Sequence, residues 1–227
     1  MSDVVPVEGA AVRRVPRQAL LVLPWFPIGL GLDALGGTTG LLLTTLVTWA
    51  LLFWVGRAQD RGGRRALIAC VLWSTAGEIA LTELFGLYHY RLGFVPPFVP
   101  PGHALLFQSG AWITAWMAPQ LRLATRWIAF PVAVGAFVLL GDQQSLCYLA
   151  IFALLLRVGS NPALYGTMFF LALTLELVGT AIGTWRWSAA DPHLGLTTVN
   201  PPVAAGVFYC VLDALVLSAQ RFSRGVD

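Results

Sequence analysis

Residues 78–103 read EIALTELFGLYHYRLGFVPPFVPPGH, and this stretch indicates both the fold class and the place of a polar site. Two carboxylates, Glu78 and Glu83, stand inside an apolar run that predicts a helix. Gly86 and an aromatic pair close the run, and two Pro-Pro pairs then lead to a lone histidine, His103. A weaker copy of this arrangement returns near the C-terminus, so the stretch predicts one of two related segments.

The composition of the whole chain is that of a membrane protein. Of its 227 residues, 57% are hydrophobic and 11% are charged, whereas soluble domains carry roughly 25% charged residues. The formal charge of +3 comes from arginine, because the chain contains no lysine. The missing lysine excludes a Schiff base, and with it a retinal pigment or an imine-forming enzyme. The positive charge is mild and confined to loops, so we expect no nucleic-acid partner.

Eight apolar segments are candidates for membrane helices, because a helix needs about 20 mainly apolar residues to cross a bilayer. We therefore expect an all-α, polytopic bundle of about eight transmembrane helices. Only Asp142, Gln143 and Gln144 separate the short fifth and sixth segments, which could instead form one kinked element. The predicted helices cover residues 18–35, 38–56, 65–88, 103–118, 123–141, 144–158, 162–184 and 202–220.

The arginines predict the orientation of these helices. With a cytoplasmic N-terminus, only Arg91 and Arg186 of the 14 arginines fall on the opposite side. Such a bias is the positive-inside pattern, and merging the fifth and sixth helices would spoil it. We expect a multi-pass protein of the bacterial cytoplasmic (inner) membrane with both termini inside. The predicted cytoplasmic arginines are Arg13, Arg14, Arg17, Arg57, Arg61, Arg64, Arg65, Arg122, Arg126, Arg157, Arg221 and Arg224.

The two halves of the chain resemble each other. The pattern Gly-x-Tyr-x-Tyr from Gly86 is matched by Gly-x-Trp-x-Trp from Gly183, and each is followed by a Pro-Pro pair. The near-constant offset of ~100 residues indicates an internal repeat. Four helices per copy is an even number, so the copies should be parallel. We expect a cytoplasmic arm (1–17), two four-helix repeats (18–118 and 119–220) and a cytoplasmic tail (221–227).

Carboxylates inside the predicted helices are the main functional candidates, because an ionised side chain at the bilayer centre costs at least ~2.5–3.5 kcal/mol. We name Glu78 and Glu176 as an acid/base pair, one from each repeat, with Asp213 and His103 as supporting or orienting groups. Lacking embedded cationic partners, the acids should be neutral, as general-acid chemistry requires. Alternatively, each is a packing residue, protonated and hydrogen-bonded to a neighbouring helix.

Aromatic pairs in the two matching loops predict the wall of a cavity. Such a wall suits a lipophilic substrate that passes through a carbocation, because aromatic faces stabilise cations. The same pairs could instead belong to a membrane-interface belt. The histidines show no spacing that supports a metal site, and we expect no metal and no cofactor. The candidate substrate-binding residues are Tyr88, Tyr90, Trp185, Trp187, Glu83, Tyr209 and Trp112.

Each copy of the repeat consists of Gly-x-aromatic-x-aromatic, a loop with prolines, and a helix with an aromatic residue, which is Phe107 in the first copy and Phe208 in the second. This repeated pattern resembles the lycopene cyclase domain. Related proteins are the bacterioruberin-type carotenoid hydratases, in which an acidic residue resembles Glu78, and the more distant meroterpenoid cyclases. The VPPGH string is also similar to one in a group of bacterial integral membrane proteins. The cyclase domain places paired glutamates directly after its proline, whereas this chain has Gly102-His103 and Val203-Ala204 there.

The resemblance implies a membrane enzyme that acts on a polyisoprenoid. A membrane-embedded glutamic acid would protonate an alkene, and the product would arise by cyclisation, hydration or isomerisation.

Two other functions fit the same residues. Duplicated halves with buried carboxylates are also typical of a proton-coupled transporter of a small lipophilic or polar solute, although the prolines cluster at helix ends rather than in mid-membrane. The third function is that of a non-catalytic subunit that binds membrane lipid. The sequence does not determine the oligomeric state.

Overall fold

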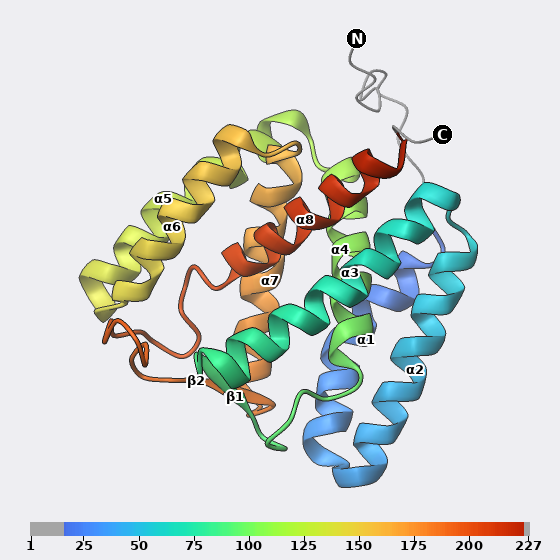
Figure 1. Ribbon diagram of the computed structural model, residues 1–227, viewed down its shortest axis with the longest axis horizontal. Helices are drawn as coiled ribbons and strands as arrows, with labels where there is room; N and C mark the ends of the chain where they lie inside the picture. Colours follow the sequence, from blue (N-terminus) through green and yellow to red (C-terminus); the bar gives the residue numbers. More distant parts are fainter. Residues whose placement is uncertain (1–15, 225–227) are drawn as a thin grey trace.

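The computed structural model describes residues 16–224, and the side chains of residues 16–220. Most of the predicted arm (1–17) and the tail from 221 therefore lie outside the described residues or side chains, including Arg13, Arg14, Arg221 and Arg224. Within the described part, the prediction of an all-α bundle is confirmed, and the fifth and sixth helices are separate (Figure 1). The elements are α1 (Ala19–Leu35), α2 (Gly37–Arg57), α3 (Arg61–Ile79), the π-helical η1 (Ala80–Leu84), β1 (Tyr88–Tyr90), α4 (Val99–Trp116), α5 (Pro119–Leu140), α6 (Gln143–Val158), α7 (Pro162–Ala181), β2 (Trp185–Trp187) and α8 (Gly206–Arg224).

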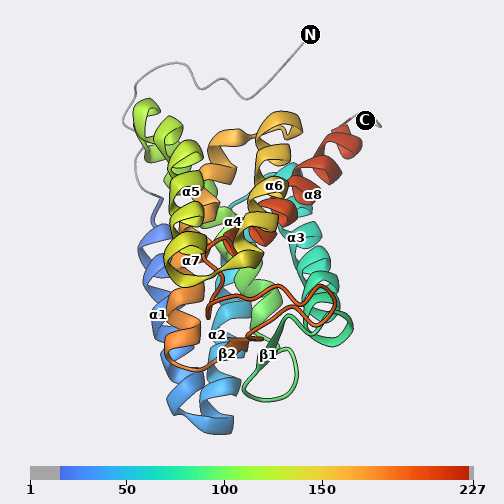
Figure 2. The ribbon, with the colours of Figure 1, turned by 90° about the vertical axis from the view of Figure 1, so that its left-hand side faces the viewer.

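Four helices form the centre of the bundle. Helix α3 packs against α4 and α8, and α7 packs against the same two helices. The α1–α2 pair lies on one side of this centre and the α5–α6 pair on the other (Figure 1). Strands β1 and β2 pair with each other near one end of the bundle, and α8 ends at the opposite end (Figure 2).

Short connections are made possible by glycines with left-handed backbone. Gly37, with φ of 54°, joins α1 directly to α2, and a Cβ at Gly40 would overlap the carbonyl oxygen of Leu32. Gly141, with φ of 72°, ends α5, and the Asp142 side chain then caps α6 by accepting from the Ser145 amide. This glycine and cap separate α5 from α6, because an αL residue ends the first helix and a side-chain acceptor begins the second.

The helix ends near the paired strands differ from the prediction. The helix predicted to reach residue 88 ends as α3 at Ile79 and continues only as η1, because Gly86 turns the chain with φ of 61°. Helix α4 begins at Val99, so Pro100 and Pro101 form its first turn, where proline is tolerated. His103 thus lies one turn inside α4. Likewise, α7 ends before Gly183, which has φ of 76°, and α8 begins after the predicted residue 202.

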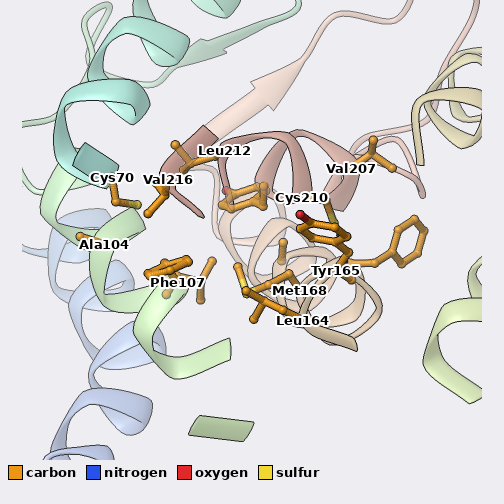
Figure 3. Close-up of a cluster of buried hydrophobic side chains, with 14 of the residues drawn as sticks. Cys70, Ala104, Phe107, Leu164, Tyr165, Met168, Val207, Cys210, Leu212 and Val216 are labelled. Atoms are coloured by element: carbon orange, nitrogen blue, oxygen red, sulfur yellow. Dashed lines mark hydrogen bonds between the residues drawn. The ribbon is translucent and has the colours of Figure 1, made fainter. Parts of the chain in front are cut away.

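Aromatic, aliphatic and sulfur-containing side chains fill the space between the four central helices. Figure 3 shows this cluster, in which Cys70 and Cys210 are fully buried and unpaired. A Cβ at Gly110 of α4 would overlap the Met168 side chain of α7, so these two helices are in close contact there. The labelled residues of Figure 3 are Cys70, Ala104, Phe107, Leu164, Tyr165, Met168, Val207, Cys210, Leu212 and Val216.

Four helical segments of the described chain are long and apolar enough to cross a membrane: Gly37–Arg57, Arg61–Leu84, Pro119–Leu140 and Pro162–Ala181. Helices α1 and α6 are shorter apolar helices. Their outer faces nevertheless expose large apolar residues such as Leu21, Ile28 and Leu154. Extensive apolar surface of this kind is typical of proteins that lie in lipid. The fold is therefore a helical membrane bundle.

Candidate functional site

Glu78 of α3 is a buried carboxylate that accepts hydrogen bonds from both tyrosines of β1. The hydroxyl groups of Tyr88 and Tyr90 lie 2.7 and 2.6 Å from Oε2 of Glu78. Alternate residues of a strand point to the same face, so the Tyr-x-Tyr spacing brings both phenols to one oxygen. Burial, followed by the negative charge of Glu78, raises the pKa of both phenols well above the usual value. They therefore remain protonated and act as donors.

Glu176 of α7 has a matching environment built from β2. The indole Nε1–H groups of Trp185 and Trp187 donate to its Oε2 at 2.7 and 2.9 Å. The hydroxyl group of Tyr209 donates to its Oε1 at 3.1 Å. An indole N–H can only donate, so the Glu176 oxygen that faces both indoles is an acceptor. Three donors therefore surround one buried carboxyl group and fix the orientation of both its oxygens.

The pairing of β1 with β2 brings these two environments together. Tyr88 lies opposite Trp187, and Tyr90 lies opposite Trp185. The rings of Tyr88 and Trp187 have centroids 4.8 Å apart, which is within the range of favourable aromatic contacts. The strand pair therefore fixes one aromatic wall that carries donors for both carboxylates.

His103 connects the two carboxylates. Its Nδ1 lies 3.0 Å from the Val99 carbonyl oxygen, and because a carbonyl only accepts, Nδ1 carries a proton. Its Nε2 lies 3.3 Å from Oε1 of Glu78. The imidazole ring also stacks on Tyr209, with centroids 5.0 Å apart and an interplanar angle of 9°, and Tyr209 in turn donates to Glu176.

This geometry gives the Glu78–His103 pair one mobile proton. With Nδ1–H committed to Val99, either Glu78 is protonated and donates to a neutral Nε2, or a cationic imidazole faces the carboxylate. The residues that line the surrounding cavities include no Lys or Arg. Among the described residues that line the two cavities, His103 is therefore the only one that can carry a positive charge beside Glu78 and Glu176.

Two cavities lie beside the carboxylates, and five residues line both of them: Glu78, Tyr88, His103, Glu176 and Tyr209. The first, the α1–α2 cavity, is completed by residues of α1, α2 and α4 and has a volume of about 60 Å³. The second, the α3–α8 cavity, is completed by residues of α3 and α8 and has a volume of about 90 Å³.

Three predicted site residues lie outside both cavities. Glu83 is exposed, at η1, and lines a separate hollow with His89 and His193. Trp112 packs against the central core. Asp213 is fully buried, and within the described residues neither of its carboxyl oxygens has a hydrogen-bond partner. The other eight predicted residues all line at least one of the two cavities.

The α1–α2 side of the site was not predicted. Trp25 and Phe26 of α1, together with Thr44 and Thr48 of α2, line the α1–α2 cavity. These residue types are common in membrane helices, and nothing in their spacing distinguishes a cavity wall from a lipid-facing surface.

Gly179 provides a test of the Glu176 environment. A Cβ at this position would overlap the Trp185 ring, so Gly179→Ala should displace the indole and lower the stability by about 1–3 kcal/mol. Gly135→Ala in α5 is the matched control, because its Cβ would meet nothing within 4 Å and alanine favours a helix by up to ~1 kcal/mol. Thermal unfolding in detergent measures both, and equal melting temperatures would contradict the contact.

Together, the fold and the site define a helical membrane protein in which two buried carboxylates and a histidine meet at a small aromatic cavity. No family model, no curated protein and no solved structure matches this chain.

Proposed function

We propose that this protein is an integral membrane enzyme that acts on a polyisoprenoid, carotenoid or terpenoid, or on another lipophilic substrate, by protonating an alkene. The supporting observation is the convergence of Glu78, His103 and Glu176 on cavities whose walls are otherwise mostly apolar. A carboxylic acid that shares its proton with an imidazole is a proton donor placed beside a hydrocarbon-binding space.

In this proposal the chemistry begins at Oε1 of Glu78. The acid proton passes to one alkene carbon, the π electrons form the new C–H bond, and the neighbouring carbon becomes cationic. The faces of Tyr88 and Trp187, and the Glu176 carboxylate, stabilise that cation. Loss of a proton from a neighbouring carbon to Glu78 or Glu176 re-forms an alkene and gives isomerisation. Attack by an internal alkene forms a C–C bond and a new cation, which loses a proton in the same way and gives cyclisation. Water adds as an oxonium ion, which releases a proton to the same carboxylate and gives hydration.

Heavy water tests the reaction class. Nanodiscs containing the protein and lycopene, incubated in heavy water, should yield product with deuterium bound to carbon, since the proton that Glu78 delivers exchanges with solvent. Mass spectrometry of the extracted lipids measures the label. Nanodiscs without protein are the control, and lycopene that stays unlabelled and unchanged in both samples would contradict alkene protonation.

We also propose that all eight helices lie in the membrane as two parallel repeats, 18–118 and 119–220, with both termini cytoplasmic in a bacterial inner membrane. The strand pair supports this, because the two backbone hydrogen bonds that flank it correspond to each other in the two repeats. Replacing each residue of one bond by its counterpart in the other repeat gives the other bond. Ser188 N–H donates to the Leu87 carbonyl, and Arg91 N–H donates to the Thr184 carbonyl, each at 2.9 Å. Such reciprocal contacts are expected about a two-fold axis.

A proton-coupled transporter is the second candidate, and η1 is the observation that favours it. This π-helical segment interrupts the helical run directly after Glu78, and π-helical turns and interrupted helices are frequent at functional sites of membrane proteins. Proteoliposomes distinguish the two functions. A proton gradient that drives solute uptake without chemical change of the solute would favour transport, whereas deuterated product favours the enzyme.

A further inference from the structure

We infer that an anionic phospholipid binds in a groove between α2 and α3, with its phosphate on Arg57 and Arg64 and an acyl chain along the apolar part. The groove is separate from the candidate site, because none of its lining residues lines either of the two cavities beside Glu78 and Glu176. The inference therefore goes beyond the proposed function and does not depend on it.

The α2–α3 groove is apolar over most of its length and has a volume of about 460 Å³. Leu52 and Leu67, which are buried, form its floor, and exposed side chains such as Phe53 and Ile68 form its walls. Gly56 leaves room above the floor, since a Cβ there would meet only Leu67 Cδ1, at 3.9 Å. The groove therefore offers a hydrocarbon chain a lining of branched and aromatic side chains.

Both arginines lie at one end of this groove. Trp49 and Leu72 also line it, and each lies eight residues from the arginine of its own helix, which is about 12 Å along a helix. The Trp49 ring is held in place, because its indole N–H donates to the Pro97 carbonyl at 3.2 Å. The groove thus has a cationic end and an apolar end, which match the anionic head and the apolar chain of a phospholipid.

The two guanidinium groups are available to a phosphate. Arg57 and Arg64 are exposed, and within the described residues neither forms an ion pair with a carboxylate. Asp60, in the connection between α2 and α3, instead caps α3 by accepting from the Gly63 amide at 2.7 Å. The Arg57 guanidinium lies 4.3 Å from the centroid of the Phe53 ring. An arginine stacked in this way can still donate its N–H groups to a phosphate, because the guanidinium has five donors in one plane.

A lipid fits this groove better than a helix of another protein does. Membrane helices associate through small residues that let their backbones approach closely, whereas large exposed side chains such as Trp49, Phe53 and Leu72 stand along this groove. In the proposed orientation its two arginines lie on the cytoplasmic side, where anionic lipids attract basic side chains close to a membrane helix.

Native mass spectrometry of the detergent-purified protein tests the inference, with phosphatidylglycerol compared with phosphatidylcholine of the same acyl chains. The wild type should bind one phosphatidylglycerol at least about fivefold more tightly than one phosphatidylcholine. Arg64→Gln should lower the affinity for phosphatidylglycerol by about fivefold, which corresponds to the ~1 kcal/mol that one arginine contributes near an anionic lipid. Arg157→Gln is the matched control, because Arg157 is an exposed arginine in the last turn of α6, outside the groove, and it should keep the wild-type affinity.

Gly56→Leu tests the place of the acyl chain. A leucine there occupies the groove beside the arginines, so the affinity for phosphatidylglycerol should fall at least as much as in Arg64→Gln. Gly77→Leu is its control, since a Cβ at Gly77 of α3 would meet nothing within 4 Å and Gly77 lies outside the groove.

Three results would overturn the inference. Equal affinities of the wild type for the two lipids, or equal affinities of Arg64→Gln and Arg157→Gln for phosphatidylglycerol, would show only diffuse attraction between arginines and anionic lipid. An unchanged affinity in Gly56→Leu would place the lipid outside the groove. A lipid-free dimer that Gly56→Leu dissociates and Gly77→Leu preserves would assign the groove to a second copy of the chain.

Discussion

Glu78→Gln should lower product formation by about 10²–10⁴-fold, which is the contribution of a positioned general acid. An amide cannot release a proton to an alkene, whereas its carbonyl oxygen can still accept from Tyr88 and Tyr90. The fold should therefore persist. The initial rate of deuterium incorporation from heavy water, with lycopene as the probe, measures the effect, and thermal unfolding measures the stability of the same sample.

Glu83→Gln is the matched control for this variant. It makes the same chemical change five positions along the chain, at an exposed residue that lines neither cavity, and it should leave the rate unchanged. If Glu78→Gln retained the wild-type rate, Glu78 would not be the proton donor. If it lost stability while product formation per folded molecule stayed constant, Glu78 would act as a packing residue between α3, β1 and α4.

Glu176→Ala should have the largest effect on stability. The substitution leaves the indole N–H groups of Trp185 and Trp187 and the hydroxyl group of Tyr209 without their acceptor. A buried donor without a partner costs about 1–3 kcal/mol, and we expect a total loss of about 3–5 kcal/mol after relaxation. A lower melting temperature in detergent and a changed tryptophan emission spectrum would report it.

Glu83→Ala again supplies the control for Glu176→Ala, because it removes a carboxylate that is exposed. Glu176→Gln should lie between the two, since it keeps one acceptor oxygen but adds an NH₂ group that faces donors. A Glu176→Ala protein as stable as the Glu83→Ala protein would show that the three hydrogen bonds contribute nothing.

Much of the architecture could be predicted because membrane helices obey strong local rules. An apolar run that lacks charges forms a helix, since lipid offers no other partner for its backbone groups. The eight helices of the described residues, and the separation of α5 from α6, are near their predicted places, and four helical segments are long and apolar enough to cross a membrane. The ends of the helices beside the site were less predictable. Gly86, Gly183 and the first-turn prolines of α4 set these ends through the backbone conformation that each residue adopts.

The sequence predicted which residue types form the candidate site better than it predicted which individual residues line its cavities. Buried carboxylates are costly in lipid, so Glu78, Glu176 and Asp213 were conspicuous in the sequence. The sequence could not separate Asp213, which is buried but outside both cavities, from Glu78 and Glu176, which line both. Nor could it predict the wall formed by Trp25 and the threonines of α2, since that wall depends on how α1 and α2 pack against α4 and α7.

The segment from Glu78 to His103 also has some features that the sequence determines and others that only the tertiary structure decides. By itself the sequence determined that a carboxylate, two tyrosines and a histidine lie near one end of the bundle, because local spacing and helix length dictate it. Only the tertiary structure decided that this carboxylate shares its cavities with Glu176, and that Tyr209 of α8 stacks on His103 and donates to Glu176. The reason is physical: the rotation of a helix about its axis and the register of β1 against β2 are set by packing between distant segments.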